Sequence, residues 1–89
     1  MKAVISVIGK DCVGILAKVS GVCAAHSVNV VDVTQSVLQD VFVMVMLGEI
    51  DRMDCSMSEL SDELSRLGGE LGLDIRVMHE DIFNSMHRI

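Results

Sequence analysis

Seven consecutive apolar residues at positions 41–47 most constrain what this chain can fold into. In an extended segment the odd-numbered members of the run point to one face and the even-numbered members to the other. The run is far too short to cross a membrane. It therefore predicts a strand over residues 41–50 that lies inside a sheet and needs apolar cover on both faces.

A second strand pattern precedes this run and begins at Asn29. Its alternation separates two faces, with Val31, Val33 and Val37 on one and Asp32, Thr34 and Ser36 on the other. Gln39 and Asp40 form a tight turn between the two strands, which are expected to make an antiparallel hairpin with one solvent-exposed face.

Two segments carry helical spacing. In the second, residues 57, 60, 64, 67 and 71 are Met or Leu, Ser56 and Glu59 form a capping box, and Gly72 is placed to end the helix. Gly68 and Gly69 are expected to loosen its last turns. The first helix is predicted over residues 14–27, where its apolar positions are Ile15, Leu16, Val19, Val22 and Cys23.

Strand patterns at 2–8 and 74–80 complete the order β-α-β-β-α-β. This order predicts an α+β fold, a ferredoxin-like sandwich with a four-stranded antiparallel sheet and two helices on one face. Right-handed crossovers place the first and third strands in the centre. We expect one domain over 1–80 and a helical tail over 81–89, with Asp81 as its N-cap, that packs on the domain or on a partner.

Charge and cysteine content limit the partners and the cellular location that can be expected. The net charge is −6 with only seven Lys and Arg among 89 residues, which argues against nucleic acid and anionic membranes as partners. No signal-peptide pattern is seen at the start of the sequence. Cys12, Cys23 and Cys55 form no C-x-x-C motif, so a reduced, cytoplasmic location is expected.

The residues offer little for catalysis. Cys12 is the one candidate nucleophile, and His26 is expected about 20 Å away at the far end of the first helix. Cys23 and His26 lie three residues apart and could reach one metal ion, but no second ligand pair matches them. We expect Cys23 in the core and His26 at the helix dipole, and we predict no enzyme activity, catalytic residue, metal or cofactor.

The strand-to-helix segment 8–16 is the candidate binding site. Backbone N–H groups at such a helix start favour a carboxylate or phosphate, and Gly9 and Gly14 would allow close approach. The glycine spacing does not match a nucleotide-binding loop. The alternative is that the glycines only make a turn and that Asp11 only caps the helix.

Taken together, the segments VIGKDCVGIL at 7–16 and HSVNVVDV at 26–33 resemble the ACT domain, and in particular small ACT proteins and the ACT halves of the glycine-cleavage-system transcriptional repressor. The resemblance covers residues 1–80. A G-x-D-x-x-G-I motif corresponds to Gly9, Asp11, Gly14 and Ile15, and the Asn that begins the second strand to Asn29. Val13 stands where many ligand-binding ACT loops have proline.

This resemblance implies pairs of chains that bind a regulatory amino acid where the first loop meets a partner. Our hypothesis is a non-enzymatic regulatory module, a homodimer or higher even oligomer that acts on an unidentified protein. The expected ligand-binding residues are Gly9, Lys10, Asp11, Cys12, Val13, Gly14, Ile15 and Asn29. The alternative is a structural or protein-interaction module with no small-molecule ligand.

Overall fold

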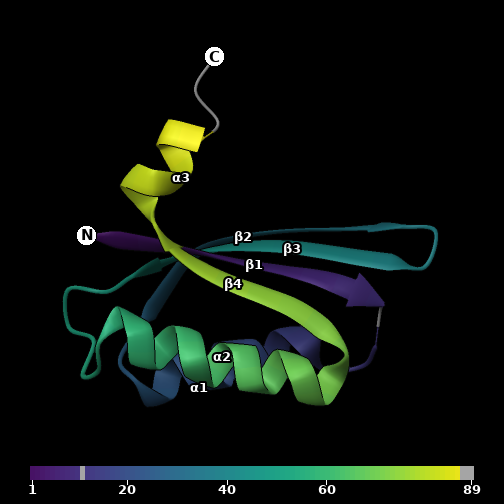
Figure 1. Cartoon of the computed structure of the whole chain (residues 1–89), viewed down its shortest axis with the longest axis horizontal. Helices are drawn as coiled ribbons and strands as arrows, with labels where there is room; N and C mark the ends of the chain where they lie inside the picture. Colours follow the sequence, from purple (N-terminus) through teal and green to yellow (C-terminus); the bar gives the residue numbers. More distant parts are fainter. Residues whose placement is uncertain (11, 87–89) are drawn as a thin grey trace.

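One antiparallel sheet with the strand order β2-β3-β1-β4 organises the chain. The computed structural model describes residues 1–10 and 12–86. Its elements are β1 (Lys2–Lys10), α1 (Ile15–Ala25), β2 (Asn29–Leu38), β3 (Val41–Glu49), α2 (Met57–Leu71), β4 (Leu73–His79) and α3 (Glu80–Met86). Figure 1 shows α1 and α2 together on one side of the sheet. The predicted ferredoxin-like order, with the first and third strands central, is confirmed.

The core lies between the sheet and these two helices. On this face β1 and β3 pair Ile5 with Met46 and Val7 with Met44, and all four side chains are fully buried. Leu64 of α2 is also inaccessible to solvent. The core is therefore aliphatic and rich in methionine, because the chain has only two aromatic residues.

Helix α2 begins and ends as its sequence predicts. The Glu59 N–H donates to Ser56 Oγ at 3.1 Å, and the Ser56 N–H donates to Glu59 Oε1 at 3.2 Å. Gly72 ends the helix in the left-handed region at φ 71°. Gly68 is buried within the helix, where an added Cβ would lie only 2.6 Å from the Leu73 carbonyl oxygen. The glycine therefore allows close packing of α2 on β4, a role that the expectation of a loosened helix end missed.

Strand β2 departs from simple alternation. A bulge between Val30 and Asp32 shifts the register, after which Val33 lies opposite Met46 on the helix-covered face. Val31, which sequence alternation grouped with Val33, falls at this bulge and is exposed. One extra residue in a strand moves the residues that follow it to the other face of the sheet. No residue pattern in β2 predicts this bulge.

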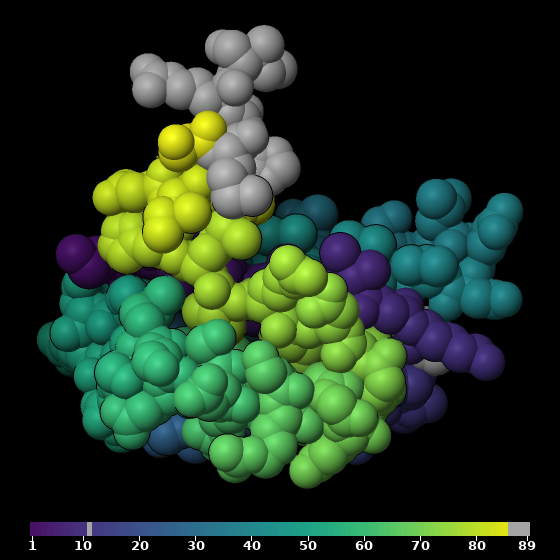
Figure 2. Space-filling view, in the orientation of Figure 1, coloured from purple at the N-terminus to yellow at the C-terminus, as the bar shows by residue number. Residues whose placement is uncertain are grey.

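Helix α3 lies on the opposite face of the sheet from α1 and α2 (Figure 1), where it contacts β1 and β4. Figure 2 shows it projecting from the rest of the molecule. A cavity of about 230 Å³ separates it from the sheet and is lined in part by Val4, Thr34, Leu47, Glu80 and Phe83. Part of the second sheet face is thus covered within the chain.

The start of α3 corrects one sequence prediction. The helix begins at Glu80, so Asp81 lies in its first turn and is not the N-cap. The Asp81 N–H instead donates to Nδ1 of His79 at 3.1 Å. The imidazole of His79, the residue before the helix, thus accepts from the first turn and takes the capping role that was expected of the Asp81 carboxylate.

Candidate functional site

The β1–α1 loop is exposed at Cys12 and Val13 and leads into α1 through the half-buried Gly14. This residue is the N-cap of α1 and adopts the left-handed region at φ 86°, which favours glycine. Gly14 has no side chain that could cap the helix, and a Cβ added to it would meet nothing within 4 Å. Val13 is 98% exposed and Cys12 is also exposed. The first-turn N–H groups of α1 are therefore not satisfied by a side-chain cap at Gly14.

Two other residues of the predicted site, Gly9 and Ile15, are packed against the rest of the domain. Gly9 lies between Phe42 and Leu73 in the sheet, and an added Cβ would lie 2.7 Å from Leu73 Cδ2. Ile15 is only 3% exposed and belongs to the core. Lys10 is exposed at the end of β1, and Asp11 lies outside the described residues. The accessible part of the loop is thus Lys10, Cys12, Val13 and the backbone at Gly14.

Asn29 lies at the opposite end of the sheet from this loop. It pairs with Glu49, which in turn pairs with Lys2 at the start of β1. Gly9 is seven positions further along β1. At the rise of an extended strand this spacing amounts to roughly 23 Å, so one chain does not bring Asn29 to its own loop.

Asn29 lines a hollow of its own at that end. The hollow measures about 280 Å³ and is lined by Ser27, Asn29, Glu49 and Arg52. A guanidinium and a carboxylate in one hollow can pair with the carboxylate and the ammonium of a zwitterion. Ser27 is near Asn29 in sequence, whereas Glu49 and Arg52 could not be predicted because only the strand register and the loop after β3 bring them to Asn29.

His26 forms the most connected polar cluster at this end of the molecule. It is the C-cap residue of α1, and in its protonated form it donates from Nδ1 to Asp54 Oδ1 at 3.0 Å and from Nε2 to Glu63 Oε2. These hydrogen bonds, that to Asp54 first, raise the pKa of His26. The predicted position at the helix end is correct, but the partners lie 28 and 37 residues away and could not be found from sequence spacing.

The three cysteines occupy three different settings. Cys23 is fully buried in the core, as predicted, and burial raises the pKa of its thiol. Cys12 precedes α1 whereas His26 follows it, so the two residues stand at opposite ends of this helix. The fold thus does not bring Cys12 and His26 together as a nucleophile and base. Cys55 is half-buried beside Asp54, and desolvation is the main cause that raises the pKa of its thiol.

Comparison with known proteins identifies the class. A model of the ACT domain family matches residues 2–78. An ACT domain protein from Streptococcus pneumoniae is 36% identical and superimposes with a TM-score of 0.81, covering 93% of each chain. A structure described as a glycine cleavage system transcriptional repressor superimposes over 86% of this chain and 45% of its own with a TM-score of 0.75; at 15% identity it supports the fold alone.

The chain therefore belongs to the ACT domain family, as its motifs indicated. Among its relatives is a UPF0237 protein of Methanopyrus kandleri, 47% identical over 88 residues and aligned over 99% of this chain and 98% of the relative. Within the part of the chain that the structure describes, no helix combines the length and the apolar character needed to cross a membrane.

Proposed function

We propose that the chain is a non-enzymatic regulatory module that binds a small amino acid or a related metabolite at the β1–α1 loop, near a dimer interface. ACT domains are generally regulatory modules that bind small ligands. The observation that carries the proposal is the helix start at Gly14, which has no side chain to cap the helix and has free space where a Cβ would lie. Its N–H groups and the positive end of the α1 dipole suit an α-carboxylate.

The second half of the proposed site comes from a partner chain. Asn29, Glu49 and Arg52 offer an amide, a carboxylate and a guanidinium, which suit the polar groups of an amino acid. Because these residues lie at the other end of the sheet, the loop of one chain would meet the hollow of its partner across a two-fold axis. Two equivalent sites per dimer follow from that symmetry.

The open face of the sheet supports association. Ile8, Val41 and Leu38 are exposed there, beyond the part that α3 covers. Exposed apolar side chains grouped on one face favour contact with a second copy. A homodimer or a higher even oligomer would bury them, and ACT domains commonly dimerise. The same face is what favours the alternative function, a protein-interaction module with an empty loop.

We place the module in the cytoplasm, since its three cysteines are free thiols that suit a reducing compartment. Regulation would pass to another protein through contact with the ligand-bound form.

Calorimetric titration against each standard amino acid tests the proposed function. We expect at least one to bind, and Asn29→Ala and Arg52→Ala each to weaken it. The matched control is Arg76→Ala, because Arg76 is exposed on β4 and pairs with Asp74. If none of the amino acids gives heat or a thermal shift, the loop has only a structural role, and the alternative function, a protein-interaction module, is supported instead.

A further inference from the structure

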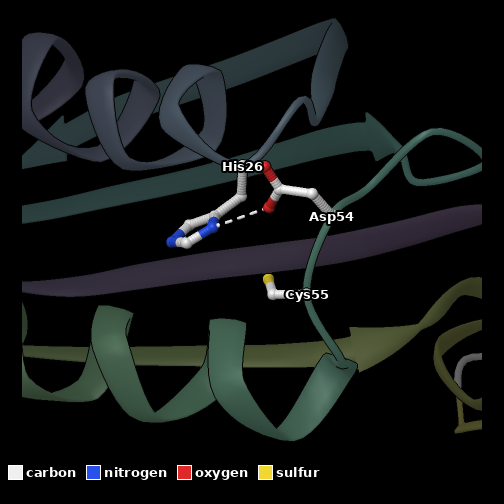
Figure 3. Close-up of side chains that lie close together, drawn as sticks. All are labelled: His26, Asp54 and Cys55. Atoms are coloured by element: carbon white, nitrogen blue, oxygen red, sulfur yellow. Dashed lines mark hydrogen bonds and ion pairs between the residues drawn. The ribbon is translucent and has the colours of Figure 1, made fainter.

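Three side chains of different chemistry converge where the end of α1 meets the segment before α2. They are His26, Asp54 and Cys55, here called the His26 cluster (Figure 3). Their ligand-type atoms, an imidazole nitrogen, a carboxylate oxygen and a thiol sulfur, all lie within 4.8 Å of one another. The cluster lies at the far end of α1 from the Gly14 loop and is not used by the proposed function.

We propose that the His26 cluster binds a zinc ion through His26 Nδ1, a carboxylate oxygen of Asp54 and the Cys55 sulfur. Zinc bonds of about 2.0–2.3 Å in a tetrahedral arrangement separate ligand atoms by roughly 3.3–3.8 Å. Nδ1 and the Asp54 oxygen are 3.0 Å apart, so small side-chain rotations reach this geometry. A water or an external ligand completes the fourth position.

Glu63 supports this assignment from the other side of the imidazole. A histidine that binds a metal through Nδ1 keeps its proton on Nε2, and an outer carboxylate that accepts this proton fixes the ring and strengthens its basicity. Glu63 is the partner of His26 Nε2. It is therefore a positioning residue for the ring and not a zinc ligand.

The backbone holds the ligands in place without help from a metal. The Asp54 N–H donates to the His26 carbonyl oxygen at 3.1 Å, which fixes the two ligand-bearing segments side by side. Cys55 follows directly and precedes Ser56, whose capping box anchors the start of α2. A site held this way loses little conformational freedom when the ion binds.

Charge and donor type favour zinc over other cations. Glu59, Asp62 and Glu63 line the hollow beside His26, together with one cation, Arg66. The chain as a whole carries a net charge of −6. The acidic surroundings attract a cation, whereas the combination of thiolate and imidazole selects zinc over magnesium or calcium, which prefer oxygen ligands alone.

The test uses the full chain, free of affinity tags and stripped of metal with a chelator that is then removed. Calorimetry with ZnCl2 should show one zinc ion per chain, and MgCl2 should give no heat. Co²⁺, a spectroscopic substitute for zinc, should produce a near-ultraviolet band that arises only from a thiolate bound to cobalt. Absence of both zinc binding and the cobalt band would overturn the proposal.

Matched variants assign the ligands. Cys55→Ser should abolish the cobalt band, and Cys12→Ser, which changes an exposed thiol elsewhere, should leave it intact. Glu63→Gln should keep the band but weaken metal binding by about 10–100-fold. Circular dichroism confirms that each variant is folded. A band that survives Cys55→Ser, or that disappears in folded Cys12→Ser, contradicts the assignment.

Discussion

Gly9 and Leu73 lie so close across the β1–β4 pair that a Cβ added to Gly9 would be 2.7 Å from Leu73 Cδ2 and 3.0 Å from the Gly72 carbonyl oxygen. The first glycine of the loop motif is therefore required by packing at the end of α2. Gly14, by contrast, is required by its backbone conformation alone. The two glycines of one sequence motif thus have separable physical roles.

Replacing either glycine by alanine should reveal this difference. Gly9→Ala forces Leu73 and the Gly72 backbone to move, and overpacking of this kind costs about 1–3 kcal/mol of the free energy of unfolding. Gly14→Ala meets no neighbour and should cost only about 1 kcal/mol for the left-handed conformation. Urea unfolding measures both. Equal stability of Gly9→Ala and the parent chain would contradict the packing role.

The capping box of α2 predicts a local effect. Ser56→Ala removes the acceptor of the Glu59 N–H and should lower the free energy of unfolding by about 1 kcal/mol. Ser58→Ala is the control, since Ser58 is exposed within the first turn of the same helix and should change stability by less than about 0.5 kcal/mol. The two variants are compared by urea unfolding under the same conditions.

A core leucine and an exposed leucine provide a second contrast. Leu64→Ala empties space in the fully buried layer between α2 and the sheet and should destabilise the chain by about 2–5 kcal/mol. Leu38 is 74% exposed at the end of β2, and Leu38→Ala should have little effect on a monomer. If Leu38→Ala instead destabilises the protein by an amount that depends on the protein concentration, Leu38 is buried between chains.

The ion pair between the Met1 ammonium and Asp51 predicts a pH dependence. The ammonium donates to Asp51 Oδ1 at 2.7 Å, which raises its pKa from the ordinary value of 8.0 and lowers the pKa of Asp51 from 3.8. The pair contributes stability between these ordinary values, and this contribution is lost as the pH rises through the raised ammonium pKa or falls through the lowered pKa of Asp51.

Urea midpoints measured from about pH 7 to about pH 10 should therefore decrease, and the decrease should be smaller in Asp51→Asn. Both groups are exposed, so the difference should be small and should shrink at high salt. Identical pH profiles for the two proteins at low salt would show that the pair contributes nothing measurable.

Removal of the tail tests the assembly. Truncation after Glu80 removes Phe83 from the cavity above Val4 and Leu47, and it should weaken self-association or increase binding of a dye specific for apolar surfaces. Sedimentation of the full chain at micromolar concentration should show a dimer or a higher even oligomer. A well-behaved monomer would mean that α3 protects the sheet within its own chain.

Much of the fold could be predicted because it depends on local signals. The periodicity of α2, its capping box and Gly72 each act within a few residues, and the apolar run at 41–47 identifies a central strand without further information. The bulge at Val31 and the cap of α3 by His79 could not be predicted. The bulge depends on the register of neighbouring strands, and the cap depends on the rotamer of one imidazole.

The polar clusters show the same limit more strongly. Nothing near His26 in sequence indicates Asp54 or Glu63, and nothing near Asn29 indicates Arg52. These residues come together because the hairpin and the loop after β3 return the chain to the end of α1, and because α2, which carries Glu63, packs beside α1. Such long-range placement requires the three-dimensional structure, even where the sequence has already indicated the fold.

The separation of Asn29 from the Gly14 loop has a thermodynamic consequence. A ligand that must touch both ends of the sheet binds only where two chains meet, so binding and association are linked by mass action. Its apparent affinity would rise with the concentration of the protein itself, and dilution alone would release it. Such a module would report how much of itself the cell contains as well as how much metabolite.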